Sequence, residues 1–376
     1  MSFRARALKR VHDNRDKKLA GGYNSIPFGY KRLQQFIPGV QKSNIVLMTA
    51  NSGVGKSKLC KNMYVFRPFD FVHRNPHLNI KLSTLYFCLE EPGEAFVHSL
   101  WCYKLRELHK LRISIKELRS QLNPDDPTAM VSTDILGKID DLQDYTDEFE
   151  KSVMLIDDVR HPYGIYRRCV DFLESVGDYD MEPVKFWNKA TGKMETKIVK
   201  GPYFTTHPDH YVQIIIDHVS LIEPEKGQDL FEAIRTLSNR YLVSLRNRYH
   251  CSIVVVQQQA SDKEKQQYTY KGASIESKLE PSLDGLGDCK LTQRDADEIF
   301  GIFAPDRYEI KEHRGYDITQ LQDNYRSYLF LKTRDGEANK RLAFFFDGAT
   351  NFLAELPPAD KMDSDAYAKA LRLAGR

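Results

Sequence analysis

The sequence of 376 residues lacks three features that mark particular classes of protein. It has no apolar run long enough to cross a membrane and no signal-peptide pattern, so we expect a cytoplasmic protein without membrane contacts. None of its six cysteines forms a Cys-x-x-Cys pair, which argues against zinc sites and disulfides and favours buried free thiols. Its formal net charge is only +3, so any surface for nucleic acid must be local.

What the sequence does contain is enough apolar material for a core, since 41% of its residues are hydrophobic. Apolar runs predict strands at residues 44–50, 83–89, 153–156, 211–216, 252–256, 298–303, 328–331 and 341–346. Helical patterns fill most of the intervals, at residues 94–109, 113–150, 164–175 and 230–249. Buried strands separated by helices predict an α/β fold with a mostly parallel sheet that helices cover on both faces.

Three segments lie outside this alternation. Residues 1–20 are basic with a partial apolar stripe, which predicts a short basic helix that Gly21 and Gly22 end. Residues 180–209 carry a turn signal at their centre and predict an inserted β-hairpin. Residues 260–293 are polar and without period, which is typical of a mobile loop. We therefore divide the chain into a basic N-terminal helix (1–24), a main domain (25–357) and a C-terminal tail (358–376).

A phosphate-binding pattern follows the first predicted strand. Residues 50–57 read Ala-Asn-Ser-Gly-Val-Gly-Lys-Ser, close to the Walker A pattern Gly-x-x-x-x-Gly-Lys-Ser/Thr, with a small alanine at the first glycine. Such a loop wraps phosphates with its N–H groups, while its lysine contacts the β- and γ-phosphates and its serine hydroxyl binds Mg²⁺. We therefore predict a site for ATP and Mg²⁺ that is formed by Ser52, Gly53, Val54, Gly55, Lys56, Ser57 and Lys58.

Polar residues at the ends of three other predicted strands fit the same chemistry. Asp217 is placed to hold Mg²⁺ as a Walker B acid. Glu90 is placed to orient or deprotonate the attacking water, with Glu91 as its competitor. Gln258 is placed to sense the γ-phosphate. Each residue taken alone also fits a plain polar strand end.

Taken in order, these motifs resemble the RecA-like motor domain of DnaB-type replicative helicases over residues 26–355. Residues 88–92 (Cys-Leu-Glu-Glu-Pro) are similar to the family's Ser-Leu-Glu-Met-Pro, and residues 254–258 (Val-Val-Val-Gln-Gln) to its Val-Ala-Leu-Ser-Gln. Residues 292–297 (Thr-Gln-Arg-Asp-Ala-Asp) resemble its Ile-Glu-Gln-Asp-Ala-Asp. Residues 332–336 (Lys-Thr-Arg-Asp-Gly) resemble the Lys-x-Arg-Asn-Gly segment that carries a trans-acting lysine and an arginine finger.

The resemblance implies a RecA-like P-loop NTPase and an ATP-hydrolysing DNA helicase. It puts the catalytic glutamate on Glu90 and the sensor on Gln258, and it makes Lys332 and Arg334 catalytic groups that act on a neighbouring subunit's ATP. It also implies a hexameric ring, single-stranded DNA as substrate, and a primase or loader as partner. The family's N-terminal primase-binding domain has no counterpart in the matched region, where only residues 1–20 stand before the motor domain.

Other functions remain open from the sequence. In the helicase interpretation, loops at residues 223–229 and 260–290 hold single-stranded DNA. The candidate contacts in these loops are Lys263, Lys265, Lys271, Lys278, Lys290, Tyr268 and Tyr270. The alternative is a recombinase-like or loader-type ATPase that acts on DNA or a protein partner without unwinding. A non-enzymatic interaction module is the third option, and it conflicts with the presence of all the residues named above for ATP hydrolysis.

Overall fold

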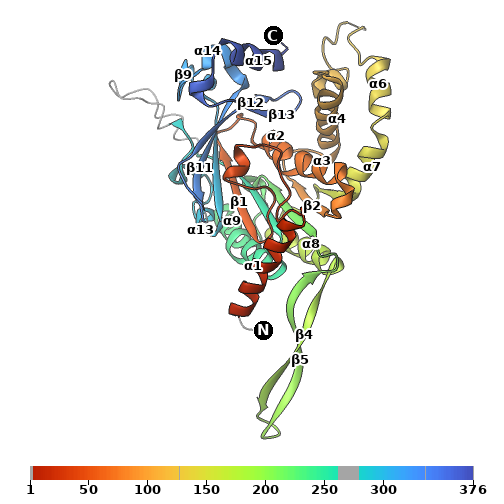
Figure 1. The fold of residues 1–376 in the computed structure, drawn as a ribbon, viewed down its shortest axis with the longest axis vertical. Helices are drawn as coiled ribbons and strands as arrows, with labels where there is room; N and C mark the ends of the chain where they lie inside the picture. Colours follow the sequence, from red (N-terminus) through yellow and green to blue (C-terminus); the bar gives the residue numbers. More distant parts are fainter. Residues whose placement is uncertain (1–2, 127, 261–278, 335, 376) are drawn as a thin grey trace, which may run out of the picture.

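The computed structural model describes residues 3–126, 128–260, 279–334 and 336–375, which fold around one nine-stranded sheet (Figure 1). The strand order is β13-β12-β11-β8-β1-β7-β6-β2-β3. The strands are β1 (Asn44–Ala50), β2 (Lys81–Cys88), β3 (Val153–Ile156), β6 (His210–Asp217), β7 (Ser252–Gln258), β8 (Glu298–Phe303), β11 (Tyr325–Thr333), β12 (Arg341–Asp347) and β13 (Phe352–Glu355). The six strands from β3 to β8 pair in parallel, and β11, β12 and β13 continue the sheet antiparallel. The predicted α/β fold with a mostly parallel sheet is therefore confirmed.

Helices cover both faces of the sheet because its central strands are buried along their whole length, as the continuous apolar runs predicted. One face packs against the helix that runs through α2 (Lys56–Cys60) and α3 (Arg67–Arg74), together with α4 (Gly93–His109) and α7 (Gln143–Ser152). The other face packs against α8 (Pro162–Ser175) and the helix that runs from α9 (Leu230–Arg235) to α10 (Val243–Tyr249).

The two ends of the parallel strands define the directions used below. We call the end at which β1 finishes, at Ala50, the P-loop end of the sheet, and the end at which β1 begins, at Asn44, the opposite end. Between α4 and α7, the short helices α5 (Ile115–Leu118) and α6 (Thr133–Asp140) lie toward the P-loop end in Figure 1. The N-terminal helix α1 (Phe3–Leu19) lies toward the opposite end.

The predicted hairpin insertion is present and projects from the opposite end (Figure 1). Strands β4 (Gly177–Asn188) and β5 (Lys193–Thr205) form a separate two-stranded antiparallel sheet. A two-stranded sheet needs packing against a larger body to be stable. Its base supplies this through Tyr179 and Tyr203, which are buried against Tyr249 of α10.

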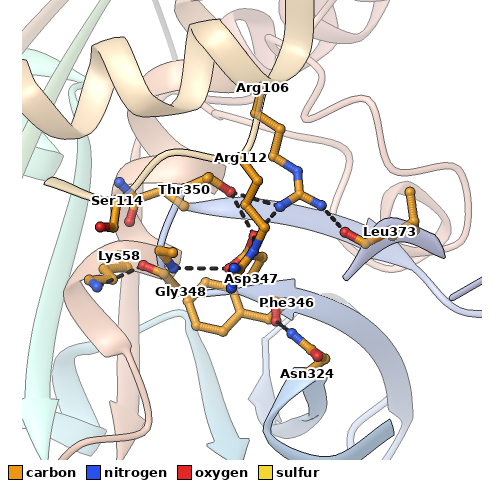
Figure 2. A network of polar contacts seen from close by, with 12 residues as sticks. Lys58, Arg106, Arg112, Ser114, Asn324, Phe346, Asp347, Gly348, Thr350 and Leu373 are labelled. Atoms are coloured by element: carbon orange, nitrogen blue, oxygen red, sulfur yellow. Dashed lines mark hydrogen bonds and ion pairs between the residues drawn. The ribbon is translucent and has the colours of Figure 1, made fainter. Parts of the chain in front are cut away.

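The C-terminal elements tie α4 to the sheet (Figure 2). Asp347 at the end of β12 is almost fully buried, and it accepts hydrogen bonds from the guanidinium groups of Arg106 in α4 and Arg112 after α4. Arg106 also donates to the carbonyl of Leu373 in α15 (Ser364–Leu373). One carboxylate therefore joins α4, the sheet and the C-terminal helix.

Several details differ from the sequence prediction. The strand β11 is longer than residues 328–331, because Arg326 and Lys332 carry long polar side chains within it. The short hairpin of β9 (Glu312–His313) and β10 (Tyr316–Asp317) and the helix α14 (Ile318–Leu321) were not predicted. Within the predicted mobile loop, residues 279–293 pack against the core and bury Leu286, while residues 261–278 lie outside the described residues.

Two predictions about compartment-sensitive features can be compared with the structure. All six cysteines are buried and unpaired, as predicted. Among the described residues, no helix combines the length and the apolar character needed to span a bilayer.

Candidate nucleotide site

The loop after β1 has the backbone shape of a phosphate-binding loop. Gly53 and Gly55 adopt φ values of 71° and 95°, a region that favours glycine. A side chain on Gly55 would lie 2.9 Å from the Phe346 ring, so the close packing also requires glycine there. Helix α2 begins at Lys56, so its N-terminal N–H groups face the loop, and such a helix start favours bound anions.

Residues distant in sequence hold this loop in place. The Arg326 guanidinium of β11 is buried and donates to the Val54 carbonyl over 2.9 Å. The Asn51 amide donates to the hydroxyl of Tyr308, just after β8, over 2.5 Å. Arg307, beside Tyr308, has its guanidinium against Gly53, since a Cβ there would lie 2.6 Å from an Arg307 nitrogen. A loop that is braced in this way loses little freedom when it wraps a ligand.

The predicted metal-binding residues meet at the P-loop end of β6. The Ser57 hydroxyl donates to Asp217 Oδ1 over 2.9 Å and lies 3.3 Å from Glu90 Oε2. The Tyr86 hydroxyl donates to the other Asp217 oxygen over 2.5 Å. Burial raises the pKa of Asp217, and the hydrogen bonds from Tyr86 and Ser57 partly offset this rise. The structure thus brings Ser57, Asp217 and Glu90 together.

Glu90 and Glu91, which competed for the catalytic role, have different surroundings. Glu90 contacts Ser57, and its carboxylate lies 3.9 Å from the His218 ring. Glu91 forms an ion pair with Lys61, whose ammonium is buried and lies 4.7 Å from the centre of the Phe96 ring. Glu91 therefore compensates a buried charge, and Glu90 is the carboxylate that faces the metal-binding residues.

The three glutamines at the end of β7 are divided in a similar way. Gln257 donates to the carbonyls of Gly287 and Cys289, and Gln259 donates to Thr49 and Ser282. Successive side chains of a strand point to opposite faces, so Gln258 points away from these contacts. Gln258 pairs with Ala50, the residue that begins the phosphate loop, and this places it beside the candidate site.

The side chains of Lys56 and Lys58 point in different directions. The Lys56 ammonium is buried and lies 3.3 Å from the Asn51 carbonyl inside the loop. The Lys58 ammonium donates to the Gly348 carbonyl over 2.7 Å, outside the loop (Figure 2). Burial lowers the pKa of Lys58. Lys58, which we predicted as a nucleotide contact, can therefore offer a phosphate only its backbone N–H in this conformation.

Lys332 and Arg334 lie at the opposite end of the sheet from the phosphate loop. Thr333 pairs with Glu298, which in turn pairs with Val46, near the start of β1. Arg334 forms an ion pair with Asp297 over 2.6 Å, and the same Asp297 accepts the Ile45 N–H. Ile45 is five residues before Ala50, roughly 16 Å at the usual rise per residue. The structure therefore does not bring Arg334 to its own chain's phosphate loop.

The sequence analysis missed the residues that support the site. Tyr86, Arg307, Tyr308, Arg326 and Phe346 all contact the loop or its acid, and none belongs to a short motif. A polar residue inside an otherwise apolar strand, such as Tyr86 or Arg326, was the available signal. Such a residue must find a partner when it is buried, but the sequence does not identify the partner.

The residues present fit a nucleoside triphosphate with Mg²⁺. The Ser57 hydroxyl and the Asp217 carboxylate are hard oxygen ligands of the kind that Mg²⁺ prefers. A bound Mg²⁺ would neutralise charge on the phosphates. Gly53 and Gly55 leave the loop's N–H groups open toward the phosphates, and Lys56 lies inside the loop.

Comparison with known proteins supports the fold. No family model matches the sequence, and no curated protein matches it. The solved ATPase domain of a DnaB-like helicase is similar, with a TM-score of 0.63 and 16% sequence identity, over 94% of this chain and 98% of that one. A DnaB-like replicative helicase, solved in work on its interactions with primase, has a TM-score of 0.60 and 17% identity, over 93% of this chain and 68% of that one. The predicted resemblance is thus confirmed in the fold, which is that of a DnaB-like helicase ATPase domain.

Proposed function

We propose that this chain is an ATP-dependent DNA helicase or single-stranded DNA translocase of the DnaB type, which hydrolyses ATP at subunit interfaces of a ring. One observation carries the proposal. The groups that bind the triphosphate and the groups that would complete catalysis lie at opposite ends of the same sheet. Head-to-tail contact between copies brings the two ends together, and such heterologous contacts close into rings.

The proposed roles follow from the positions of the side chains. Lys56 and the loop N–H groups bind the β- and γ-phosphates, and Ser57 and Asp217 hold Mg²⁺. Glu90 orients the attacking water and accepts its proton. Gln258 lies at the strand end next to the loop and would report the state of the γ-phosphate to residues beyond β7.

In the same proposal, Arg334 and Lys332 of one copy stabilise the charge on the triphosphate that the next copy holds. Lys332 currently donates to the carbonyls of Gln293 and Ala296, each over 2.7 Å, which fixes its side chain beside the Arg334 segment. An arginine finger supplied from another chain contributes roughly a thousandfold or more to the rate in related chemistry.

Mixing two inactive variants tests the division of the site. Arg334→Ala and Glu90→Gln chains should each have little ATPase activity, and their mixture should regain part of it, because some interfaces then pair an intact Glu90 with an intact Arg334. The matched control mixes Arg334→Ala with the double variant Arg334→Ala/Glu90→Gln, in which no interface has an arginine. Mixed assemblies that form and show no turnover beyond this control would overturn the trans assignment.

The DNA activity needs its own experiment. Of the predicted DNA contacts, Lys290 is exposed, and Lys263, Lys265, Lys271, Lys278, Tyr268 and Tyr270 lie outside the described residues. Strand displacement on a forked duplex, driven by ATP, is expected. DNA-stimulated ATPase activity without strand displacement would favour the loader-like or recombinase-like alternative instead.

A further inference from the structure

The outer part of the β4–β5 hairpin, residues 181–200, which we call the ribbon, has an unusual surface. It contains seven residue steps from the Met181–Lys200 pair to the Asn188–Lys193 pair, roughly 23 Å at the usual rise per residue. In Figure 1 it extends away from the body of the molecule. Most of its side chains are exposed on both faces, unlike those at the buried base.

One face of the ribbon is largely apolar. Cross-strand pairs place Trp187 beside Met194 on this face, and Ile198 beside Pro183. Trp187, Met194 and Ile198 are each 58% exposed. Contiguous exposed apolar side chains mark interaction surfaces, and tryptophan and methionine are enriched at the cores of protein interfaces. This composition favours a protein partner over a nucleic acid.

The charge of the ribbon restricts the kind of protein. Five lysines lie along it, against two glutamates, and all five lysines are exposed. These residues are Lys185, Lys189, Lys193, Lys197 and Lys200, with Glu182 and Glu195. A partner surface should therefore combine exposed apolar side chains with acidic ones.

This chain carries such a surface. Residues 121–150, which we call the acidic surface, contain nine carboxylate side chains, all exposed, and a single basic residue, Lys138. The same segment exposes Leu122, Met130 and Leu136, of which Met130 is 64% exposed. Helix α6, the centre of this segment, lies at the other end of the molecule from the ribbon in Figure 1. The ribbon cannot reach its own chain's acidic surface.

The proposed head-to-tail contact would bring the two surfaces of neighbouring copies together. The ribbon leaves the sheet just before β6, whose first residue His210 pairs with the first residue of β2, so it projects from the same end as Arg334. The acidic surface follows α4, whose Arg106 is bound to Asp347 at the P-loop end. Copies placed with one opposite end against the next P-loop end therefore align ribbon and acidic surface.

We propose that the apolar face of the ribbon binds the acidic surface of the next copy and so forms a second contact across the interface that contains the ATP site. The inference rests on the proposed ring of trans-acting sites and adds a partner surface to it. The ribbon then acts as an arm that reaches past the ATP site and holds the neighbour at a separate position.

Cross-linking between two different chains tests the contact directly. One chain carries Trp187→Cys, the other carries Leu136→Cys, and a short bis-maleimide is added to the mixture with Mg²⁺ and an ATP analogue. The native cysteines are buried, so they should not compete. A covalent dimer should form in the mixture and not with either chain alone. The matched control, Val184→Cys on the other ribbon face, should cross-link much less. Assemblies that form without a Trp187–Leu136 product would overturn the proposal.

Sedimentation provides a second test. The double variant Trp187→Ser/Ile198→Ser should raise the concentration needed for assembly by about tenfold or more, as expected when central interface side chains are lost. The control variant Val184→Ser/Phe186→Ser, on the other face of the ribbon, should change it little. Higher salt should weaken the parent assembly, because opposite charges meet across the contact.

The outcomes separate this inference from the proposed function. Unchanged assembly of the Trp187→Ser/Ile198→Ser variant, together with recovery of turnover in the Arg334 and Glu90 mixture, would reject the ribbon contact alone. The cross-link without that recovery would reject the trans site while the ribbon contact stands. Loss of binding to labelled DNA with normal assembly would mean that the ribbon binds nucleic acid, and this would also overturn the proposal.

Discussion

The two ends of the central sheet differ in almost every respect. At the P-loop end, Ser57, Asp217 and Glu90 converge, and buried groups such as Tyr86 and Arg326 fix the loop and its acid. At the opposite end, Arg334 is half exposed, and the ribbon and α1 project with exposed basic and apolar side chains. This contrast indicates that the chain holds two halves of a site, one built to bind a ligand and one built to meet another molecule.

The largest effect is expected from Lys56→Ala at the P-loop end. The ammonium inside the loop is the side-chain charge that faces the β- and γ-phosphates, so its loss should abolish nucleotide binding or turnover. Lys58→Ala, two residues along the same helix, is the control. Its ammonium is bound to Gly348 and should matter little for turnover. Near-normal ATPase activity of the Lys56 variant would refute the assignment of the phosphate loop.

The next effect separates two adjacent carboxylates. Glu90→Gln should bind ATP and lose roughly a hundredfold or more in turnover, because the amide cannot accept the proton of the attacking water. Glu91→Gln should keep most of the turnover and lower stability instead, because the buried Lys61 then faces a neutral partner. Steady-state ATPase assays with thermal unfolding measure both. An exchange of the two phenotypes would show that the catalytic role belongs to Glu91.

A smaller effect, on stability, is expected from Asp347→Asn, which tests how firmly the P-loop end is braced. Replacing the buried carboxylate leaves Arg106 without its ionic partner and should lower the free energy of unfolding by about 3 kcal/mol. Denaturant titration measures this loss. A change within error would show that the carboxylate shared by α4, β12 and α15 is not a main support of this end.

The same carboxylate predicts a pH dependence. Burial alone would raise the pKa of Asp347, but Arg112 and Arg106 outweigh burial and lower it. The folded pKa lies below the unfolded value of about 3.9, so this stabilisation is complete above that pH and is lost as the pH falls through the lowered pKa. The parent chain should therefore lose stability more steeply on acidification than Asp347→Asn does.

The smallest effect is expected at the opposite end. Removing residues 1–20 should weaken assembly while sparing the fold, because α1 is mostly exposed and is tied to its own chain near its end by the Lys17–Asp209 ion pair over 2.5 Å. Sedimentation should shift toward smaller species, with an unchanged melting temperature as the control for folding. A sedimentation profile like that of the parent would count against a role for α1 between subunits.

The contrast between the two ends also explains what the sequence could predict. Ser57, Glu90 and Asp217 were found because each stands at the end of an apolar strand, a pattern readable within ten residues. Arg326 and Val54 are 272 residues apart, and only the sheet order brings them together. The antiparallel strands β11 to β13 follow no helix-separated rhythm, so the length of β11 and its place beside β8 came from the structure alone.

The ion pair between Arg334 and Asp297 has a consequence for the timing of assembly. Asp297 also receives Arg246, so the finger shares its carboxylate with another cation. An ion pair with one side chain half exposed is worth about 1 kcal/mol or less. A triphosphate on the neighbouring copy carries several negative charges and can outcompete this single shared carboxylate. Arg334 is thus held on its own subunit and is released by the arrival of a loaded neighbour.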